Sequence, residues 1–223
     1  GNVSRDKGCK EMGAEKQACM IIGAAPVDRR VFKEFDPRHY YVICADAGYE
    51  TAVKAGVTPD LIVGDFDSAK KPAELKAKCL TLPVEKDVTD TMFAVLKGFS
   101  MGFRSFLLLG CLGGERFDHS LANLEVLQYI REHGGHGIMA DKSTKIFLLQ
   151  DERLKMTGMS GSTVSVFPYN GSACTVSYDG LKYPLNRGQL SCGNLPMGVS
   201  NLISGDPAEI RVHSGSALVV VVQ

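Results

Sequence analysis

From about residue 18 to residue 150, short apolar runs alternate with helix-like stretches, and this alternation constrains the fold more than any other feature. The runs ACMII, YYVICA, DLIVG and SFLLLG are apolar on successive residues, as expected for strands buried on both faces of a sheet. Helix-like segments fall between them, near residues 27–35, 49–55, 74–78 and 89–99. Apolar strands separated by helices predict a parallel sheet covered on both faces.

The clearest predicted helix starts just after the last of these runs, in the segment SLANLEVLQYIREHG. Leu121, Leu124 and Leu127 recur at helical spacing, so we expect them to face the core. Gly134 stands where a helix usually ends on a residue with positive φ.

After about Thr144 the pattern changes to short β-branched runs separated by glycine, proline and asparagine. Examples are STVSVFPY, CTVSYDG, AEIRVHSG and ALVVVVQ, and no convincing helix lies among them. Such runs predict a small antiparallel sandwich or barrel. We therefore expect two domains, an α/β domain over residues 1–145 and an all-β domain over residues 146–223.

Composition excludes several function classes. Lys+Arg and Asp+Glu number 25 each, so the formal net charge of zero argues against a nucleic-acid partner. No apolar run approaches the ~20 residues of a membrane span, so we expect no membrane segment. The seven cysteines form no C-x-x-C pair, which favours a reducing cytoplasmic location over a zinc or disulfide framework.

Aspartates fall at the predicted strand ends and helix starts. Asp46, Asp65 and Asp67 follow apolar runs, where ligands of open α/β sheets bind. Asp90 and Asp118 open the next two predicted helices. Converging carboxylates repel one another, and oxygen ligands without histidine or cysteine favour Mg²⁺. The alternative is that each aspartate only caps a helix or forms a turn.

Two further segments carry phosphate-binding chemistry. Gly113 and Gly114 lie between a strand and a helix, where backbone N–H groups can approach a phosphate, and Arg116 adds a cation. Lys86 precedes the helix start at Thr89, and Thr89 or Asp87 could simply cap that helix. The residues alone thus support a Mg²⁺-dependent enzyme that acts on a nucleotide or another phosphorylated substrate.

Four segments together resemble the thiamine pyrophosphokinase family. They are ADAG at 45–48, PDLIVGDFDS at 59–68, KDVTD at 86–90 and GGERFDHSLAN at 113–123, in the order of the family. The resemblance implies a Rossmann-like parallel-sheet catalytic domain followed by a C-terminal β-sandwich that binds thiamine.

The resemblance also implies the reaction and the site. Thiamine's hydroxyl attacks the β-phosphorus of ATP, which gives thiamine diphosphate and AMP. Matched by motif, the metal ligands would be Asp65, Asp67 and Asp90, and the phosphates would be oriented by Arg116 and Asp118. The nucleotide site would comprise Asp46, Gly48, Lys86, Thr89, Gly113, Gly114, His119 and Asn123.

For the vitamin, the resemblance points to Ser200 and Asn201 in the sandwich, and to a homodimer with thiamine sites between subunits. Animal members of the family place a tryptophan against thiamine, whereas this chain has none and Leu218 falls near that position. Two alternatives remain open: a non-catalytic nucleotide or thiamine sensor, and another ATP-dependent diphosphokinase or nucleotide hydrolase.

Overall fold

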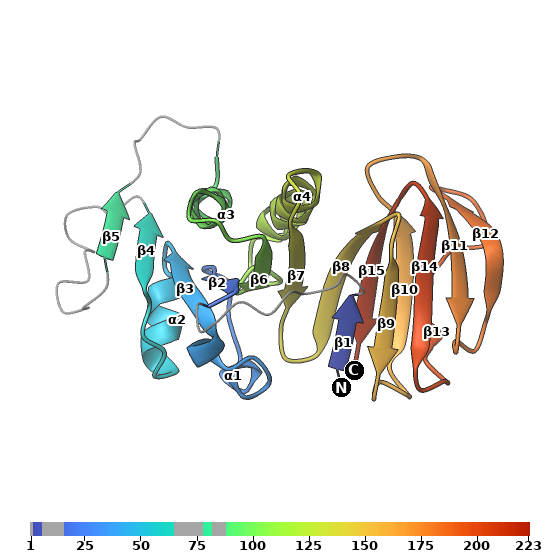
Figure 1. Cartoon of the computed structure of the whole chain (residues 1–223), viewed down its shortest axis with the longest axis horizontal. Coiled ribbons are helices and arrows are strands. Elements are labelled where there is room, and N and C mark those ends of the chain that lie inside the picture. Colours follow the sequence, from blue (N-terminus) through green and yellow to red (C-terminus); the bar gives the residue numbers. More distant parts are fainter. Residues whose placement is uncertain (1, 6–15, 65–77, 82–87) are drawn as a thin grey trace. The chain divides into compact units, whose positions relative to one another are not determined.

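The computed structural model describes residues 2–5, 16–64, 78–81 and 88–223 (Figure 1). Its contacts divide the chain into two compact units, with a boundary between Lys142 and Ser143. Strand β1 (Asn2–Arg5) belongs to the second unit, because it pairs with a strand there and not with the α/β sheet. The N-terminal strand therefore departs from the expectation that residues 1–145 form one domain.

The first unit is built on one parallel sheet in the order β7-β6-β2-β3-β4-β5, as the sequence predicts. Its strands are β2 (Ala18–Ile22), β3 (Tyr40–Ala45), β4 (Leu61–Gly64), β5 (Lys78–Thr81), β6 (Ser105–Leu109) and β7 (His136–Ala140). Strand β2 lies at the centre of the sheet, between β3 and β6 (Figure 1).

The helices of this unit are α1 (Val31–Glu34), α2 (Gly48–Lys54), α3 (Asp90–Ser100) and α4 (Phe117–Glu132), with a 3₁₀ turn η1 at Pro37–His39. Helix α1 is shorter than the predicted 27–35, because it begins only after a turn at 29–30 in which Asp28 Oδ1 accepts from the Arg30 amide. At its other end, Asp36 accepts from the Arg38 amide and starts η1. Of the expected helix at 74–78, residues 74–77 lie outside the described residues, and Lys78 begins β5.

Successive residues of the central strands are buried against opposite layers. Met20 and Ile22 pack in a cluster with Val31 and Ala52, so α1 and α2 cover one face of the sheet. Cys19 is also fully buried, against the other face. There α3 approaches so closely that a Cβ added to Gly98 would lie 2.5 Å from the Phe106 ring and 3.4 Å from the Cys19 sulfur. The continuous apolar runs thus reflect burial on both faces, as expected.

The buried face of α4 differs from the predicted one. Val126, Leu127 and Ile130 are buried, but Leu121 is 48% exposed. In the first turns of the helix the inward positions belong to Ser120 and Asn123. The leucine spacing was therefore a wrong guide to the start of this helix, where polar side chains face inward.

The second unit consists of two antiparallel sheets, which confirms the predicted all-β architecture. One has the order β1-β9-β14-β11-β12 and the other contains β13-β10-β15-β8. Their bounds are β8 (Thr144–Gln150), β9 (Arg153–Thr157), β10 (Thr163–Pro168), β11 (Ala173–Asp179), β12 (Leu185–Ser191), β13 (Asn201–Leu202), β14 (Ala208–Ser214) and β15 (Ser216–Val222).

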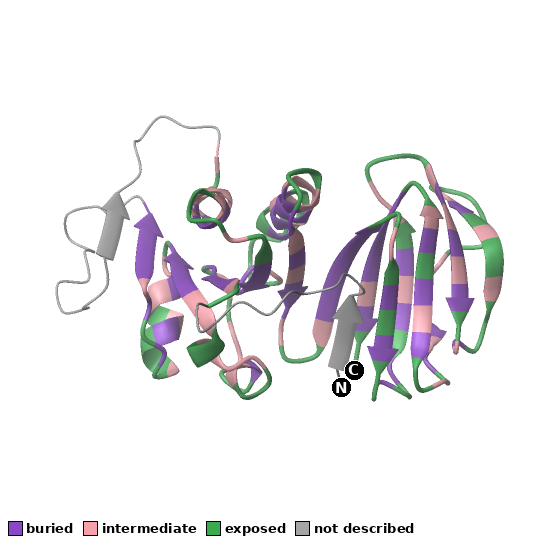
Figure 2. Ribbon diagram, viewed as in Figure 1, coloured by how far each residue is buried: buried purple, intermediate pink, exposed green. Residues whose placement is uncertain are grey.

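Burial alternates along the strands of this unit (Figure 2). Leu154 and Met156 of β9 and Ile210 and Val212 of β14 are buried, whereas the residues between them are at least partly exposed. This period of two places one side of each strand in the core and the other toward solvent. Within the described residues, no helix has the length and apolar character needed to cross a membrane.

Candidate active site

A pocket of about 550 Å³ opens at the carboxyl ends of the parallel strands. Its walls come from the segments that follow β2, β3 and β6 and from the first turns of α3 and α4. Of the predicted nucleotide and catalytic residues, the structure brings together Asp46, Thr89, Asp90, Gly113, Gly114, Arg116, His119 and Asn123. This is the location that the open α/β sheet rule predicts for a ligand.

Main chain forms the floor of the pocket where β2 and β6 end. The Gly23 amide donates to the Leu109 carbonyl (2.7 Å) and the Ala25 amide to the Gly110 carbonyl (2.9 Å). Gly110 has a φ of +65°, and a Cβ added there would lie 2.4 Å from the Gly23 carbonyl oxygen. Only glycine fits this crossing, which lets the main chains after β2 and β6 approach closely beside the pocket that Gly110 lines.

The loop after β6 is tied to α4 by two inward-facing polar side chains. Ser120 Oγ accepts a hydrogen bond from the Gly113 amide at 3.0 Å. Asn123 Nδ2 donates to the Cys111 carbonyl at 2.9 Å, within the protein interior. These bonds explain why polar residues occupy the buried positions of α4, and they fix the glycine loop against the helix N-terminus. Such a terminus favours anions.

Arg116 and Asp118 form a two-point ion pair at the start of α4. Arg116 Nε lies 2.9 Å from Asp118 Oδ1, and Arg116 Nη2 lies 2.6 Å from Oδ2. The hydrogen bonds from Arg116 lower the pKa of the Asp118 carboxyl to about 2. Arg116 lines the pocket and Asp118 does not appear among its described lining residues. Asp118 therefore fixes the direction of the Arg116 guanidinium through two parallel N–H···O contacts.

Asp46 and Asp90 present carboxylates to the pocket from two different elements. Asp46 directly follows β3 and has a φ of +50°, a conformation that aspartate tolerates better than most residues; its amide donates to the Val63 carbonyl. Asp90 is the first residue of α3. The preceding Thr89 caps that helix, because its Oγ1 accepts from the Met92 amide at 3.1 Å. Thr89 thus serves as the cap that the sequence allowed, and also lines the pocket.

Gly48 has a packing role that its sequence motif does not reveal. It is buried in the first turn of α2, and a Cβ added there would lie 2.0 Å from the Ile22 carbonyl oxygen. The described lining residues do not include it. Its contribution to a nucleotide site stays a prediction, while its effect on the approach of α2 to β2 follows from the geometry.

Three predicted residues lie outside the described part of the chain, namely Asp65, Asp67 and Lys86. Among the residues that are described, no group of three or more histidine, cysteine, aspartate or glutamate side chains could hold a metal. Asp46 and Asp90, like Glu115, line the pocket with carboxylate side chains, and carboxylate oxygens suit Mg²⁺.

Sequence reasoning missed several lining residues, chiefly Ala24, Ala25, Pro26, Thr91 and Cys111. The small residues after β2 could have been found from the rule that strand ends line the site, because they follow the central apolar run. Burial raises the pKa of the Cys111 thiol to about 12. The thiol is therefore protonated at neutral pH and unsuited to act as a nucleophile.

The predicted thiamine residues lie in the second unit and differ in what they offer a ligand. Ser200 is exposed, has a φ of +58°, and its amide donates to Ser165 Oγ. Asn201 is buried, and its side chain bonds the amide and carbonyl of Tyr183 at 3.0 and 2.9 Å. Leu218 is only 7% exposed, within β15. Of the three, Ser200 alone presents substantial surface.

Family models for the two halves of one enzyme match this chain in succession. The model for the thiamin pyrophosphokinase catalytic domain matches residues 32–139, and the model for its vitamin B1 binding domain matches residues 148–219. The chain belongs to the thiamin pyrophosphokinase family. The two matches fall on the α/β unit and on the antiparallel unit, respectively, and the first contains every described lining residue of the pocket except those directly after β2.

Named members of the thiamin pyrophosphokinase family resemble the chain over most of its length. Thiamin pyrophosphokinase 1 of Caenorhabditis elegans is 29% identical over 184 residues, which covers 74% of this chain and 70% of that protein. Thiamine pyrophosphokinase of Bacillus subtilis (strain 168) is 26% identical over 166 residues, or 72% of this chain and 77% of that protein.

Solved structures of thiamin pyrophosphokinases share the fold. The crystal structure of the Bacillus subtilis enzyme has a TM-score of 0.80 at 21% identity and covers 92% of this chain and 99% of its own. The yeast enzyme has a TM-score of 0.76 at 16% identity, covering 94% and 87%. These likenesses confirm the predicted combination of an α/β part with an antiparallel β part.

Proposed function

We propose that this member of the thiamin pyrophosphokinase family transfers the diphosphoryl group of ATP to the hydroxyl of thiamine. The hydroxyl oxygen forms a bond to the β-phosphorus, the bond from that phosphorus to the α,β-bridging oxygen breaks, and AMP leaves. The hydroxyl proton passes to a carboxylate of the site, which acts as general base. The observation that carries the proposal is the pocket in which Arg116, the glycine loop and two aspartates meet at the strand ends.

The nucleotide occupies this pocket of the α/β unit. The glycine loop at Gly113 and Gly114 and the N-terminus of α4 receive the phosphates, which matches the positive potential of a helix start. Because the Gly113 amide already donates to Ser120 Oγ, the amides that follow it are the phosphate donors. His119 and Asn123 line the same wall, and Asp46 and Thr89 face it from β3 and α3. Gly48 and Lys86 complete the nucleotide set by motif.

Arg116 neutralises phosphoryl charge, and Asp118 is its positioning partner. Phosphoryl transfer depends on positioning and charge neutralisation more than on covalent chemistry. The fixed guanidinium of Arg116 can supply both. When ATP arrives, its oxygens compete with the Asp118 carboxylate for the same N–H groups of Arg116. The planar fork permits both contacts to be shared or exchanged without rebuilding the loop.

Mg²⁺ is the implied metal, and Asp65, Asp67 and Asp90 would hold it. The donor chemistry fits, because Asp90 lines the pocket from the first turn of α3 and all three ligands are carboxylates. When bound, the ion neutralises the phosphates of ATP. Asp90 contributes its ligand from a helix start whose cap, Thr89, holds the first turn in place.

Thiamine is assigned to the antiparallel unit and to a homodimer in which the vitamin lies between subunits. Ser200 offers an exposed hydroxyl, Asn201 holds the neighbouring segment around Tyr183, and Leu218 supplies apolar packing. The functional division is a catalytic domain that ends near residue 145 and a thiamine-binding domain over residues 146–223, to which β1 adds a strand. A cytoplasmic location agrees with the free, buried thiols of Cys19, Cys44, Cys111 and Cys174.

The test is AMP formation from ATP and Mg²⁺ with and without thiamine, with thiamine diphosphate measured by mass. Thiamine-dependent AMP in equal amount to thiamine diphosphate is the expected result. AMP or ADP released without thiamine would favour a hydrolase or another acceptor. Absence of turnover together with thermal stabilisation by ATP or thiamine would favour the sensor.

A further inference from the structure

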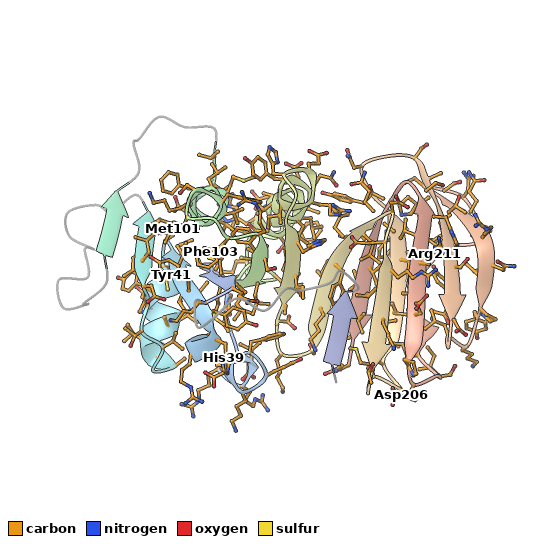
Figure 3. The ribbon with its side chains drawn as sticks, viewed as in Figure 1. His39, Tyr41, Met101, Phe103, Asp206 and Arg211 are labelled. Atoms are coloured by element: carbon orange, nitrogen blue, oxygen red, sulfur yellow. The ribbon has the colours of Figure 1, made fainter. Side chains whose placement is uncertain are left out.

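The solvent-facing side of the sheet β9-β14-β11-β12 gathers positive charge at one place. Arg211 of β14 is directly opposite Arg153 of β9 on one side and Ser177 of β11 on the other. The flanking residues Ile210, Val212 and Leu154 are buried, so the arginines face outward. Figure 3 labels Arg211 on this sheet. Like charges directly opposite each other destabilise a sheet unless something offsets them.

No described acidic side chain offsets this charge well. The described residues provide no ion pair for Arg211 or Arg187, and Arg153 Nη1 lies 3.8 Å from Glu209 Oε1, at the far end of the ion-pair range. That pair is partly exposed and contributes little, so the Arg153 guanidinium remains available. The other acidic residue of this face, Asp179, lies across from Glu209 and two positions from Ser177.

A chain of hydrogen bonds organises the centre of this charged patch. The Arg187 amide donates to Ser177 Oγ at 2.9 Å, and Ser177 Oγ lies 2.6 Å from His213 Nε2. The register shifts between Thr175 and Val176 on the β14 side and between Val176 and Tyr178 on the β12 side. These register shifts lie at His213 and Arg187, the two residues that bond Ser177, and bulges are common beside binding sites.

Arg187 has a strained backbone conformation. It has a φ of +51°, in the left-handed region that residues other than glycine, asparagine and aspartate seldom adopt. Partial burial and the nearby charges of Arg187, Arg211 and Arg153 lower the pKa of His213. Strands β9, β14 and β12 therefore place arginine or histidine residues around Ser177 of β11, on the outer face of the sheet.

We propose that Arg153, Arg187, Arg211, His213 and Ser177 form a second anion site, which binds a phosphate or diphosphate group on the outer face of this sheet. Guanidinium groups bind phosphate oxygens in pairs, and a tetrahedral oxyanion can accept from several donors at once. A carboxylate has only two oxygens for the same set. The site lies on the antiparallel unit and shares no residue with the pocket of the α/β unit.

The site is tested on the full chain by titrating inorganic phosphate, inorganic diphosphate and AMP while the histidine ring signals are followed by NMR. We expect the His213 signal to move and its pKa to rise, because a bound anion stabilises the imidazolium. His119 lines the pocket of the α/β unit and reports binding there. A response of His119 without one of His213 would overturn the proposal.

The three ligands distinguish the source of the phosphoryl group, and matched variants test the residues. A response to phosphate and diphosphate alone indicates a free inorganic anion, and a stronger response to AMP indicates the phosphate of a larger molecule.

Arg211→Ala should weaken anion binding, measured at His213, about tenfold, and Arg211→Lys should weaken it less. Lys155→Ala removes an exposed charge from the same face and should change it by less than about twofold. Equal losses in Arg211→Ala and Lys155→Ala would mean diffuse surface charge and refute the site.

Discussion

The side-chain amide of Asn123 in α4 donates a hydrogen bond of 2.9 Å to the carbonyl of Cys111 in the loop after β6. Both residues are buried apart from the surface that they give to the pocket, so loss of the bond would leave the Cys111 carbonyl without a protein partner. It joins the helix whose N-terminus faces the pocket to the loop that carries Gly113 and Gly114, and the shape of the pocket depends on it.

Asn123→Ala should therefore affect both stability and nucleotide binding. Leaving the Cys111 carbonyl unpaired costs about 1–3 kcal/mol in the free energy of unfolding, and the loosened loop should raise the KM for ATP. Chemical denaturation and steady-state kinetics measure the two effects. Glu125→Ala, an exposed position on the same helix, is the control. An unchanged KM in a destabilised Asn123→Ala protein would make this residue purely structural.

Asp118 should not be the general base. Its pKa lies at about 2 because Arg116 hydrogen-bonds the carboxylate, so near neutral pH it has little tendency to take a proton. Asp118→Asn should lower kcat by misorienting Arg116 but keep the shape of the pH–rate profile. Loss of the acidic limb of that profile in the variant would contradict the assignment.

The same ion pair links stability to acid. The folded pKa of Asp118 is below the ordinary value of ~3.9, so its contribution is present above that value and is lost as pH falls through about 2. Because both side chains are exposed, the effect is small. Acid titration of wild type and Asp118→Asn should converge at the lowest pH, and curves that stay parallel there would contradict the linkage.

Gly48→Ala should destabilise the α/β unit by about 3 kcal/mol, since the new methyl group would meet the Ile22 carbonyl at 2.0 Å. Thermal and chemical unfolding measure it. Gly171→Ala is the matched control, because a Cβ there meets nothing within 4 Å. A stable Gly48→Ala protein with impaired ATP binding would instead favour the nucleotide role predicted by motif.

The metal assignment predicts that EDTA abolishes turnover and that Mg²⁺ restores it. Asp90→Asn and Asp67→Asn should each lower kcat by about two orders of magnitude, the scale for loss of one transition-state charge contact, with folding intact. Asp36→Asn is the control, because Asp36 pairs with Arg38 at η1 and does not line the pocket. Near-normal kcat in Asp67→Asn would remove that residue from the metal site.

The parallel sheet and the antiparallel unit were predictable because burial on two faces and burial on one face leave different periods in the sequence. Cys19 and Met20 are adjacent and both buried, whereas Leu154 and Met156 alternate with exposed residues. The start of α4 was not predictable from hydrophobicity. Ser120 faces inward to bond the Gly113 amide, a contact between segments that periodicity does not record.

Within the site, Asp46, Asp90 and Arg116 were found together with Gly113 and Gly114, whereas Glu115 and the small residues after β2 were missed. Asp46, Asp90 and Arg116 carry chemistry in their side chains, so their positions at strand ends and helix starts indicated the pocket. Ala24 and Ala25 contribute mainly backbone and shape, and their residue types carry no such signal. The packing role of Gly48 was not visible in the sequence, because it depends on the Ile22 carbonyl that lies against this glycine in the fold.

The glycine crossing between Gly23 and Gly110 has a consequence for how this enzyme family member would respond to mutagenesis. Where main chain forms the floor, replacement of side chains by alanine removes none of the main-chain hydrogen bonds there, such as those from the Gly23 and Ala25 amides. An alanine scan would detect Arg116 and the aspartates but not the main-chain groups of the floor. Exchange of a peptide bond for an ester deletes one N–H donor and leaves every side chain in place. It would therefore measure the contribution of main-chain hydrogen bonds, which an alanine scan does not test.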